Sequence, residues 1–145
     1  MARLLAQGAD PNRRDREEAT PLLKVAATGN ATAARLLLER HADPDAADYS
    51  GVTPVLTAAG RGHADVLALL LENGADPDPP ETLGRLPLTS AIEGGHTRCV
   101  RLLLEHGADP NAERRFRTTP LEVAIDGGHA ELAELLRSHG AREPQ

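Results

Sequence analysis

The chain has 145 residues and a formal net charge of −6, and 24 alanines and 22 leucines dominate its apolar content, whereas Tyr49 and Phe116 are the only aromatic residues. This composition excludes an all-β fold, whose pleated faces need aromatic and β-branched side chains, and it favours helices. The acidic balance argues against general nucleic-acid binding, and the lack of an apolar run of about 20 residues argues against a membrane span.

A fixed spacing of 33 residues runs through the whole chain. Eight of the eleven prolines follow this spacing, in two series of four, and a series of glycines keeps the same step. The three series are Pro11, Pro44, Pro77 and Pro110; Pro21, Pro54, Pro87 and Pro120; and Gly29, Gly62, Gly95 and Gly128. Such a period is typical of a repeat architecture.

Taken in chain order, the period divides the sequence into a partial repeat at 1–12 and full repeats at 13–45, 46–78, 79–111 and 112–145. The first full repeat has Glu18 where the second has Gly51 in a turn, so we expect strain there if the turn needs a positive φ. In the second repeat, Thr53 and Pro54 predict the N-cap and first residue of a helix that ends at Gly62.

A second helix follows in the same repeat, with an apolar stripe at Val66, Leu67, Leu70 and Leu71. In the third repeat Leu86 replaces the capping threonine, and we expect that helix to lose a cap worth about 1 kcal/mol. The fourth repeat has Arg117 at the glycine position of the turn. Helices of two or three turns are too short to be stable alone, so the repeats are expected to stack into a solenoid.

Several recurring motifs resemble those of the ankyrin-repeat family. They are Thr20-Pro21-Leu22, Thr53-Pro54-Val55 and Thr119-Pro120-Leu121; Gly62-His63, Gly95-His96 and Gly128-His129; and Gly-Ala-Asp beginning at Gly8, Gly74 and Gly107. The resemblance covers essentially the whole chain. It implies an all-α solenoid of stacked antiparallel helix pairs with β-turn fingers, and a concave surface formed by the fingers and the first helix of each pair.

No set of residues predicts catalysis, a metal site or a cofactor. His63, His96 and His129 occupy one position in successive repeats, about 10 Å apart for packed helices, which is too far to share a zinc ion. We expect their rings to bond the backbone of adjacent loops. The repeating Asp10, Asp43, Asp76 and Asp109 are expected to bond backbone N–H groups in turns. Cys99 is predicted to be a buried small hydrophobe, and a lone cysteine suits a reducing, cytoplasmic or nuclear setting.

Positions that the repeat does not dictate are the candidates for partner binding, and they lie at the finger tips and along the ends of the first helices. Two of them, Tyr49 and Phe116, are rings at turns, where no core requires them, and aromatic and arginine residues commonly anchor interfaces. The full set is Arg16, Glu17, Tyr49, Ser50, Val52, Arg61, Thr82, Leu83, Arg85, Glu93, Arg115, Phe116, Thr118 and Asp126.

The sequence therefore predicts a non-catalytic module or scaffold that binds another protein through its concave face and finger tips. A dedicated inhibitor or immunity-type protein of one enzyme is the main alternative, and a small enzyme or metal-binding protein is a remote one. We expect a monomer, unless the first residues, which lack the first helix of a pair, allow self-association through that end.

Overall fold

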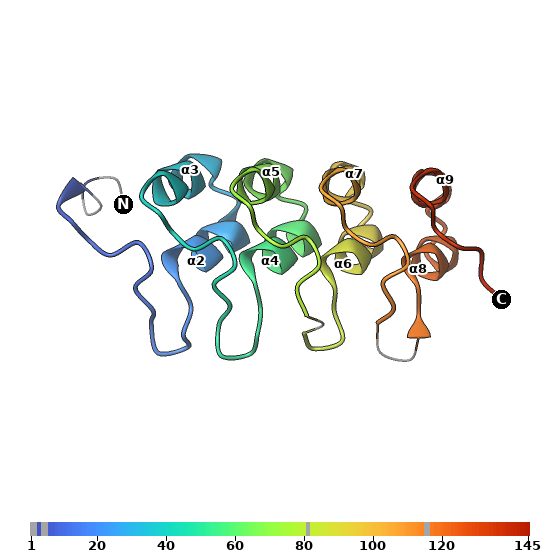
Figure 1. Cartoon of the computed structure of the whole chain (residues 1–145), viewed down its shortest axis with the longest axis horizontal. Coiled ribbons are helices and arrows are strands. Elements are labelled where there is room, and N and C mark those ends of the chain that lie inside the picture. The colour runs from blue at the N-terminus through green and yellow to red at the C-terminus, as the bar shows by residue number, and fades with distance from the viewer. Residues whose placement is uncertain (1–2, 4–5, 81, 115–116) are drawn as a thin grey trace.

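In the computed structural model of the chain, residue 3 and residues 6–80, 82–114 and 117–145 are described. Within these ranges eight helices form four successive pairs, joined by loops that project as fingers (Figure 1). The helices are α2 (Pro21–Thr28), α3 (Ala31–Glu39), α4 (Pro54–Arg61), α5 (Ala64–Glu72), α6 (Pro87–Glu93), α7 (Thr97–Glu105), α8 (Pro120–Asp126) and α9 (Ala130–Ser138). None of these helices has the length and apolar character needed to cross a membrane, as far as the described ranges extend.

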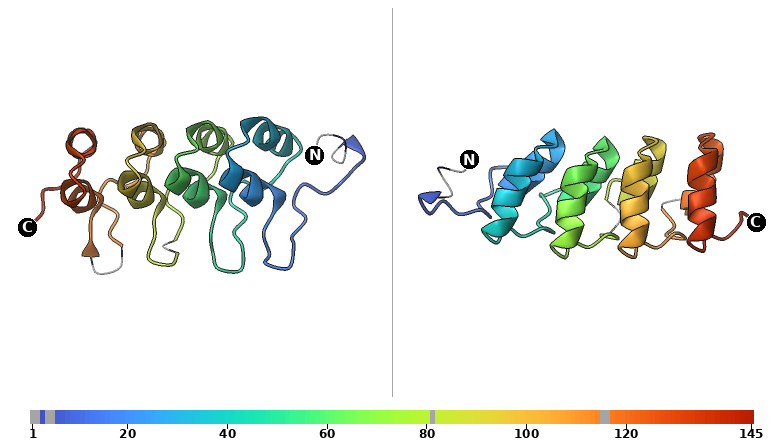
Figure 2. Two further views of the ribbon diagram at one scale, coloured as in Figure 1. Left: turned by 180° about the vertical axis from the view of Figure 1, so that it is seen from behind. Right: turned by 90° about the horizontal axis from the view of Figure 1, so that it is seen from above.

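The helices lie in two layers that run along the molecule (Figures 1 and 2). The inner layer, next to the fingers, consists of α2, α4, α6 and α8, and the outer layer consists of α3, α5, α7 and α9. Each helix packs against its partner in the pair and against the equivalent helix of the next pair. The predicted all-α solenoid of stacked helix pairs is therefore confirmed.

The inner helices begin as the sequence predicts. Thr20, Thr53 and Thr119 each cap a helix by accepting a backbone N–H bond three residues ahead, with proline as the first helical residue. At α6 the equivalent Leu86 makes no side-chain cap. The expected loss of one cap is therefore confirmed.

The core between the layers contains small and medium side chains. Its buried apolar residues, as far as they are described, are alanine, leucine, valine, isoleucine and one cysteine. Cys99, on α7, is 1% exposed, and burial raises the pKa of its thiol to about 11. The prediction that Cys99 behaves as a buried hydrophobe is confirmed.

Polar side chains between the pairs satisfy the loop backbone. Asp10, Asp43, Asp76 and Asp109 each accept a bond of 2.8–2.9 Å from the backbone N–H two residues ahead, as predicted. A second series, which the sequence analysis missed, links one pair to the next over 2.7–2.8 Å. In it the side chains of Asn12, Asp45, Asp78 and Asn111 accept from the backbone N–H groups of Asp43, Asp76, Asp109 and Arg142.

The histidines that precede the outer helices also join neighbouring pairs. Nε2 of His63 lies 3.3 Å from the carbonyl oxygen of Ala27 in the preceding pair. The rings of His63 and His96 lie over Gly29 and Gly62, where an added Cβ would come within 2.5–2.6 Å of the ring nitrogen Nδ1. His63 thus bonds the backbone as predicted, but its acceptor Ala27 lies in the last turn of α2 and not in a loop. No group of three potential metal ligands occurs among the described residues.

Candidate protein-binding surface

The first two fingers share one turn design. The carboxylate of Asp15 accepts the backbone N–H groups of Glu17 and Ala19, and Asp48 does the same for Ser50 and Val52, over 2.8–3.0 Å. Lys24 on α2 pairs with Asp15 at 2.6 Å, and its hydrogen bond is the main cause that lowers the pKa of that carboxyl. The carboxylates therefore fix the shape of these fingers from within.

These turns require left-handed backbone at one position. Gly51 has φ 83°, and Glu18 and Arg117, which replace glycine at the equivalent position, have φ 60° and 62°. The strain expected at Glu18 and Arg117 is therefore confirmed, at a cost of about 1 kcal/mol each.

Hydrogen bonds tie neighbouring fingers together. The backbone N–H of Tyr49 donates to the carbonyl of Glu17 at 3.2 Å, and the guanidinium of Arg14 donates to the carbonyls of Ala47 and Glu18 at 2.7 and 2.9 Å. The third finger is tied to the second by the Thr82 hydroxyl, which donates to the carbonyl of Gly51 at 3.0 Å. The first three fingers are thus held at fixed spacings.

The third finger departs from the others, and one predicted position is wrong because of it. Thr82 and Arg85 exchange backbone bonds of 3.1 and 2.9 Å around a two-residue turn of Leu83 and Gly84. The hairpin is one residue shorter than its neighbours, so Thr82 leaves the tip and packs against the second finger. Its 8% exposure contradicts the expectation of an exposed tip.

The other predicted residues lie at different points of the finger side of the molecule. Tyr49 and Leu83 are 74% and 76% exposed, and Arg16 and Glu17 are exposed while Ser50 is half-buried. Glu93, at the end of α6, pairs with Arg114 of the fourth finger at 2.7 Å. Arg115 and Phe116 lie outside the described residues.

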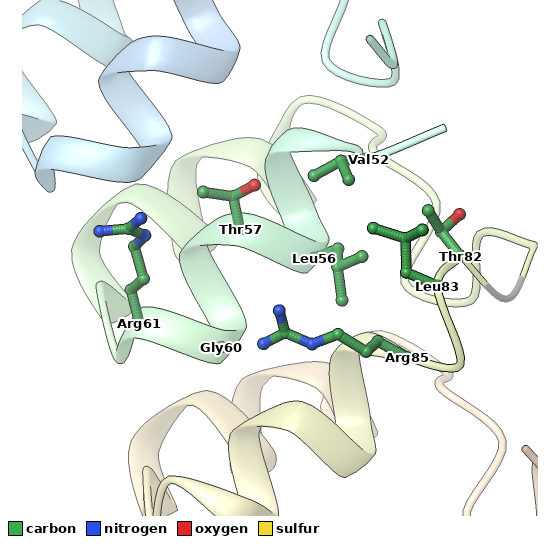
Figure 3. Close-up of a pocket in the computed structure, with 8 residues that line it drawn as sticks. All are labelled: Val52, Leu56, Thr57, Gly60, Arg61, Thr82, Leu83 and Arg85. Carbon is green, nitrogen blue, oxygen red and sulfur yellow. The ribbon is translucent and has the colours of Figure 1, made fainter. Parts of the chain in front are cut away.

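One cleft, which we call the α4 cleft, brings five of the predicted residues together (Figure 3). Its volume is about 180 Å³. One wall is formed by Val52, Leu56, Thr57, Gly60 and Arg61, and the other by Thr82, Leu83 and Arg85 of the third finger. Figure 3 shows Arg85 extending from the finger toward Gly60, with Leu83 turned toward the same space as Leu56.

A second cleft lies over α8 and contains two more predicted residues, Thr118 and Asp126. The other lining residues are Arg117, Glu122, Ile125 and Pro144. Ile125 is 45% exposed, whereas the equivalent Ala26, Ala59 and Ile92 are fully buried. The inner helix of the following pair covers each of those three residues, and α8 and α9 form the last described pair.

Three residues of the α4 cleft were missed by the sequence analysis: Leu56, Thr57 and Gly60. The signal for Gly60 is visible in the sequence, because a glycine inside a helix is disfavoured by about 1 kcal/mol against alanine and the equivalent positions hold Ala27, Glu93 and Asp126. Leu56 gave no such signal because leucine also occupies the equivalent position 23.

Comparison with known proteins identifies the repeat. The family model described as "Ankyrin repeats (3 copies)" matches residues 1–81 and 73–144, which together cover nearly the whole chain. A search of curated proteins finds no match. Ankyrin repeats generally serve as protein–protein interaction modules and are generally non-enzymatic. The helix pairs, the fingers and the family match agree, and the chain belongs to the ankyrin-repeat family.

Proposed function

We propose that this chain is a non-catalytic module that binds one partner protein along the finger tips and the inner helices. The observation that carries the proposal is the position of Tyr49 and Leu83, two large apolar side chains about three-quarters exposed, on neighbouring finger tips. Exposed apolar side chains that gather on one surface mark interaction sites. The fixed spacing of the fingers supports the proposal further, because a preorganised surface loses less entropy on binding.

The surface is large enough for a specific complex. A standard interface buries about 800 Å² on each partner, and the accessible surface of the molecule is 7762 Å². Such an interface would occupy about a tenth of this surface. With a single cysteine and so no internal disulfide, the protein also suits a reducing compartment, and we propose that it acts in the cytoplasm.

A capture experiment with matched variants tests this function. The intact chain is immobilised as bait, and the captured protein is identified by mass spectrometry. We expect Tyr49→Ala combined with Arg16→Ala to lower recovery of that protein by about tenfold or more, as for residues that anchor an interface. Arg35→Ala combined with Arg101→Ala changes exposed residues of the outer layer and should leave recovery unchanged.

Thermal unfolding of both variants should match that of the parent chain, since all four residues are exposed. Loss of capture with the outer-layer variant alone would contradict the proposal. If the captured protein is an enzyme that loses activity in a one-to-one complex, the module acts as a dedicated inhibitor, which would use the same surface with higher affinity.

A further inference from the structure

We infer that the α4 cleft receives an aliphatic side chain of the partner that is flanked by aspartate or glutamate, so that the partner binds through an acidic–aliphatic segment. This inference rests on the proposed function and adds the chemistry of the segment that the surface recognises.

The floor of the cleft is apolar, and the two later helix pairs lack this property. Val52, which precedes α4, and Leu56, on α4, lie on one wall. The equivalent positions hold Ala19 and Leu23 in the first pair, both buried, but Arg85 and Thr89 in the third pair and Thr118 and Glu122 in the fourth. An aliphatic side chain in the α4 cleft would therefore contact Val52 and Leu56 on one wall and Leu83 on the other.

The size of the cleft indicates a side chain as the occupant. Pockets for small-molecule ligands and cofactors occupy about 300–1,000 Å³, whereas this cleft has about 180 Å³. A cleft of this volume has room for one aliphatic side chain and little more. Because a single buried side chain is the usual anchor of a segment in a groove, the volume fits a peptide segment of a partner.

The charge of the cleft is opposite to that of the protein. Arg61 and Arg85 line it, and neither guanidinium has a hydrogen-bond or ion-pair partner within the described part of the chain. Both are exposed, on a chain with a net charge of −6. Guanidinium groups recognise carboxylates through paired hydrogen bonds, so acidic residues beside the aliphatic one would complement the cleft.

Gly60 gives Arg85 its position. A Cβ added to Gly60 would lie 3.2 Å from a terminal nitrogen of Arg85 and 3.5 Å from Cβ of Ser90. The guanidinium therefore lies close to the backbone of α4, in space that a larger residue would fill. The hydroxyl of Ser90, which is buried here, has no hydrogen-bond partner among the described residues.

Leu83 provides the second, independent observation. Its side chain is 76% exposed and its backbone has φ 54°, a conformation in which leucine is rare and strained. Exposure and strain both make leucine unfavourable at this tip in the free protein. Contact with a partner's aliphatic side chain would remove Leu83 from water, and this burial would favour binding.

Synthetic decapeptides test the inference, with the intact chain labelled at its leucine and valine methyl groups for NMR titration. The probe peptide has a central leucine flanked by aspartate and glutamate. In one matched peptide asparagine and glutamine replace the acids, in a second lysine replaces them, and in a third serine replaces the leucine. We expect the acidic–leucine peptide to bind with a Kd of about 1 mM or below and to shift the methyl signals of Val52, Leu56 and Leu83.

We expect each matched peptide to bind at least about tenfold more weakly. Arg61→Gln with Arg85→Gln should weaken the acidic–leucine peptide to the level of the amide peptide, whereas Arg35→Gln with Arg101→Gln should not. Leu83→Asn should also weaken it while the chain stays folded, because asparagine tolerates the left-handed conformation.

Equal binding of the four peptides, or shifts outside the cleft, would overturn the inference, and so would the absence of binding by the acidic–leucine peptide at several millimolar. Loss of the inference leaves the proposed function standing if the captured partner still depends on Tyr49 and Arg16. If instead the acidic–leucine peptide binds at the cleft but the Tyr49 and Arg16 variant captures the partner as well as the parent chain does, the inference stands and the proposed role of the finger tips fails.

Discussion

At the residue scale, the polar series that links successive helix pairs uses two residue types for one task. Asn12 and Asn111 accept a backbone N–H and also donate from Nδ2 to the carbonyls of His41 and Gly140, at 3.1 and 3.0 Å. Asp78 accepts the same kind of bond at 2.7 Å but cannot donate when ionised. Burial raises the pKa of the Asp78 carboxyl; the hydrogen bond from the backbone N–H of Asp109 lowers it in part, and the negative charges of Asp109 and Asp76 raise it further.

Replacement of Asp78 by asparagine should therefore stabilise the protein. Asp78→Asn keeps the accepted bond and adds a donor toward the carbonyl of Gly107, the residue equivalent to Gly140. We expect the free energy of unfolding at pH 7 to rise by about 1 kcal/mol, as measured by urea titration. The reverse change at the equivalent site, Asn111→Asp, should lower it by a similar amount.

The gain should depend on pH in a defined direction. Because the pKa of Asp78 is higher in the folded than in the unfolded chain, ionisation destabilises the fold, and this cost is complete only above the folded pKa. Below the ordinary aspartate pKa of about 4 both states are protonated, and the gain from Asp78→Asn should shrink there. A gain that stays constant between pH 4 and pH 7 would contradict this explanation.

Cys99 allows a second test at this scale, because only the thiolate reacts with alkylating reagents. Its 1% exposure and a pKa raised to about 11 should make the native protein react with iodoacetamide at pH 8 at least about a hundredfold more slowly than the urea-unfolded chain. Mass spectrometry of timed samples measures both rates. Comparable rates would show that α7 is not packed as described.

At the scale of elements, a close contact between a glycine and the next histidine joins α2 and α4 to the following pair. Gly62 ends α4 with φ 75°, and a Cβ added there would lie 2.6 Å from Nδ1 of His96. Gly128 has a similar φ of 71°, but no described atom lies within 4 Å of an added Cβ. The two glycines thus share the backbone requirement and differ in the ring contact.

This difference predicts unequal costs for the same substitution. Gly128→Ala should lower the free energy of unfolding by about 1 kcal/mol, which is the cost of the left-handed backbone alone. Gly62→Ala should cost at least about 1 kcal/mol more, because the His96 ring must move. Urea unfolding of the two variants measures the difference, and equal losses would rule out the ring contact as a constraint.

The fingers show where sequence reasoning succeeds and where it fails. The 33-residue period predicted the helix pairs, the threonine caps and the missing cap at Leu86, because these follow from local chemistry repeated in each pair. It placed Thr82 at a tip by copying the register of the other fingers. The one-residue shift was not predictable, because it depends on the hydroxyl of Thr82 reaching Gly51 and on Leu83 adopting an unfavourable conformation.

At the scale of the whole molecule, the candidate site was predicted only in outline. Five predicted residues meet in the α4 cleft, since finger and helix positions that repeat in sequence also line one surface. The position of the Arg85 guanidinium beside Gly60 depends on the space there, and that space requires two helix pairs in contact. Sequence positions that vary between repeats do not show which residues of neighbouring helix pairs come into contact.

The packing of the whole molecule also explains why aromatic residues are scarce. The helices are thin and closely stacked, so their shared core consists of alanine and leucine, with smaller numbers of valine and isoleucine. Tyr49 remains outside this core, on a finger tip with 74% exposure. The composition therefore reflects two parts of the molecule: a core of helices rich in alanine and leucine, and an exposed surface formed by the fingers.

The central claim is that the partner covers the fingers and inner helices and leaves the outer layer exposed. Amide hydrogen exchange of the chain, alone and with its captured partner, tests this most directly. We predict slower exchange with partner bound at residues 48–57 and 82–85, with exchange in α3, α5 and α7 unchanged. Protection confined to those outer helices would contradict the account.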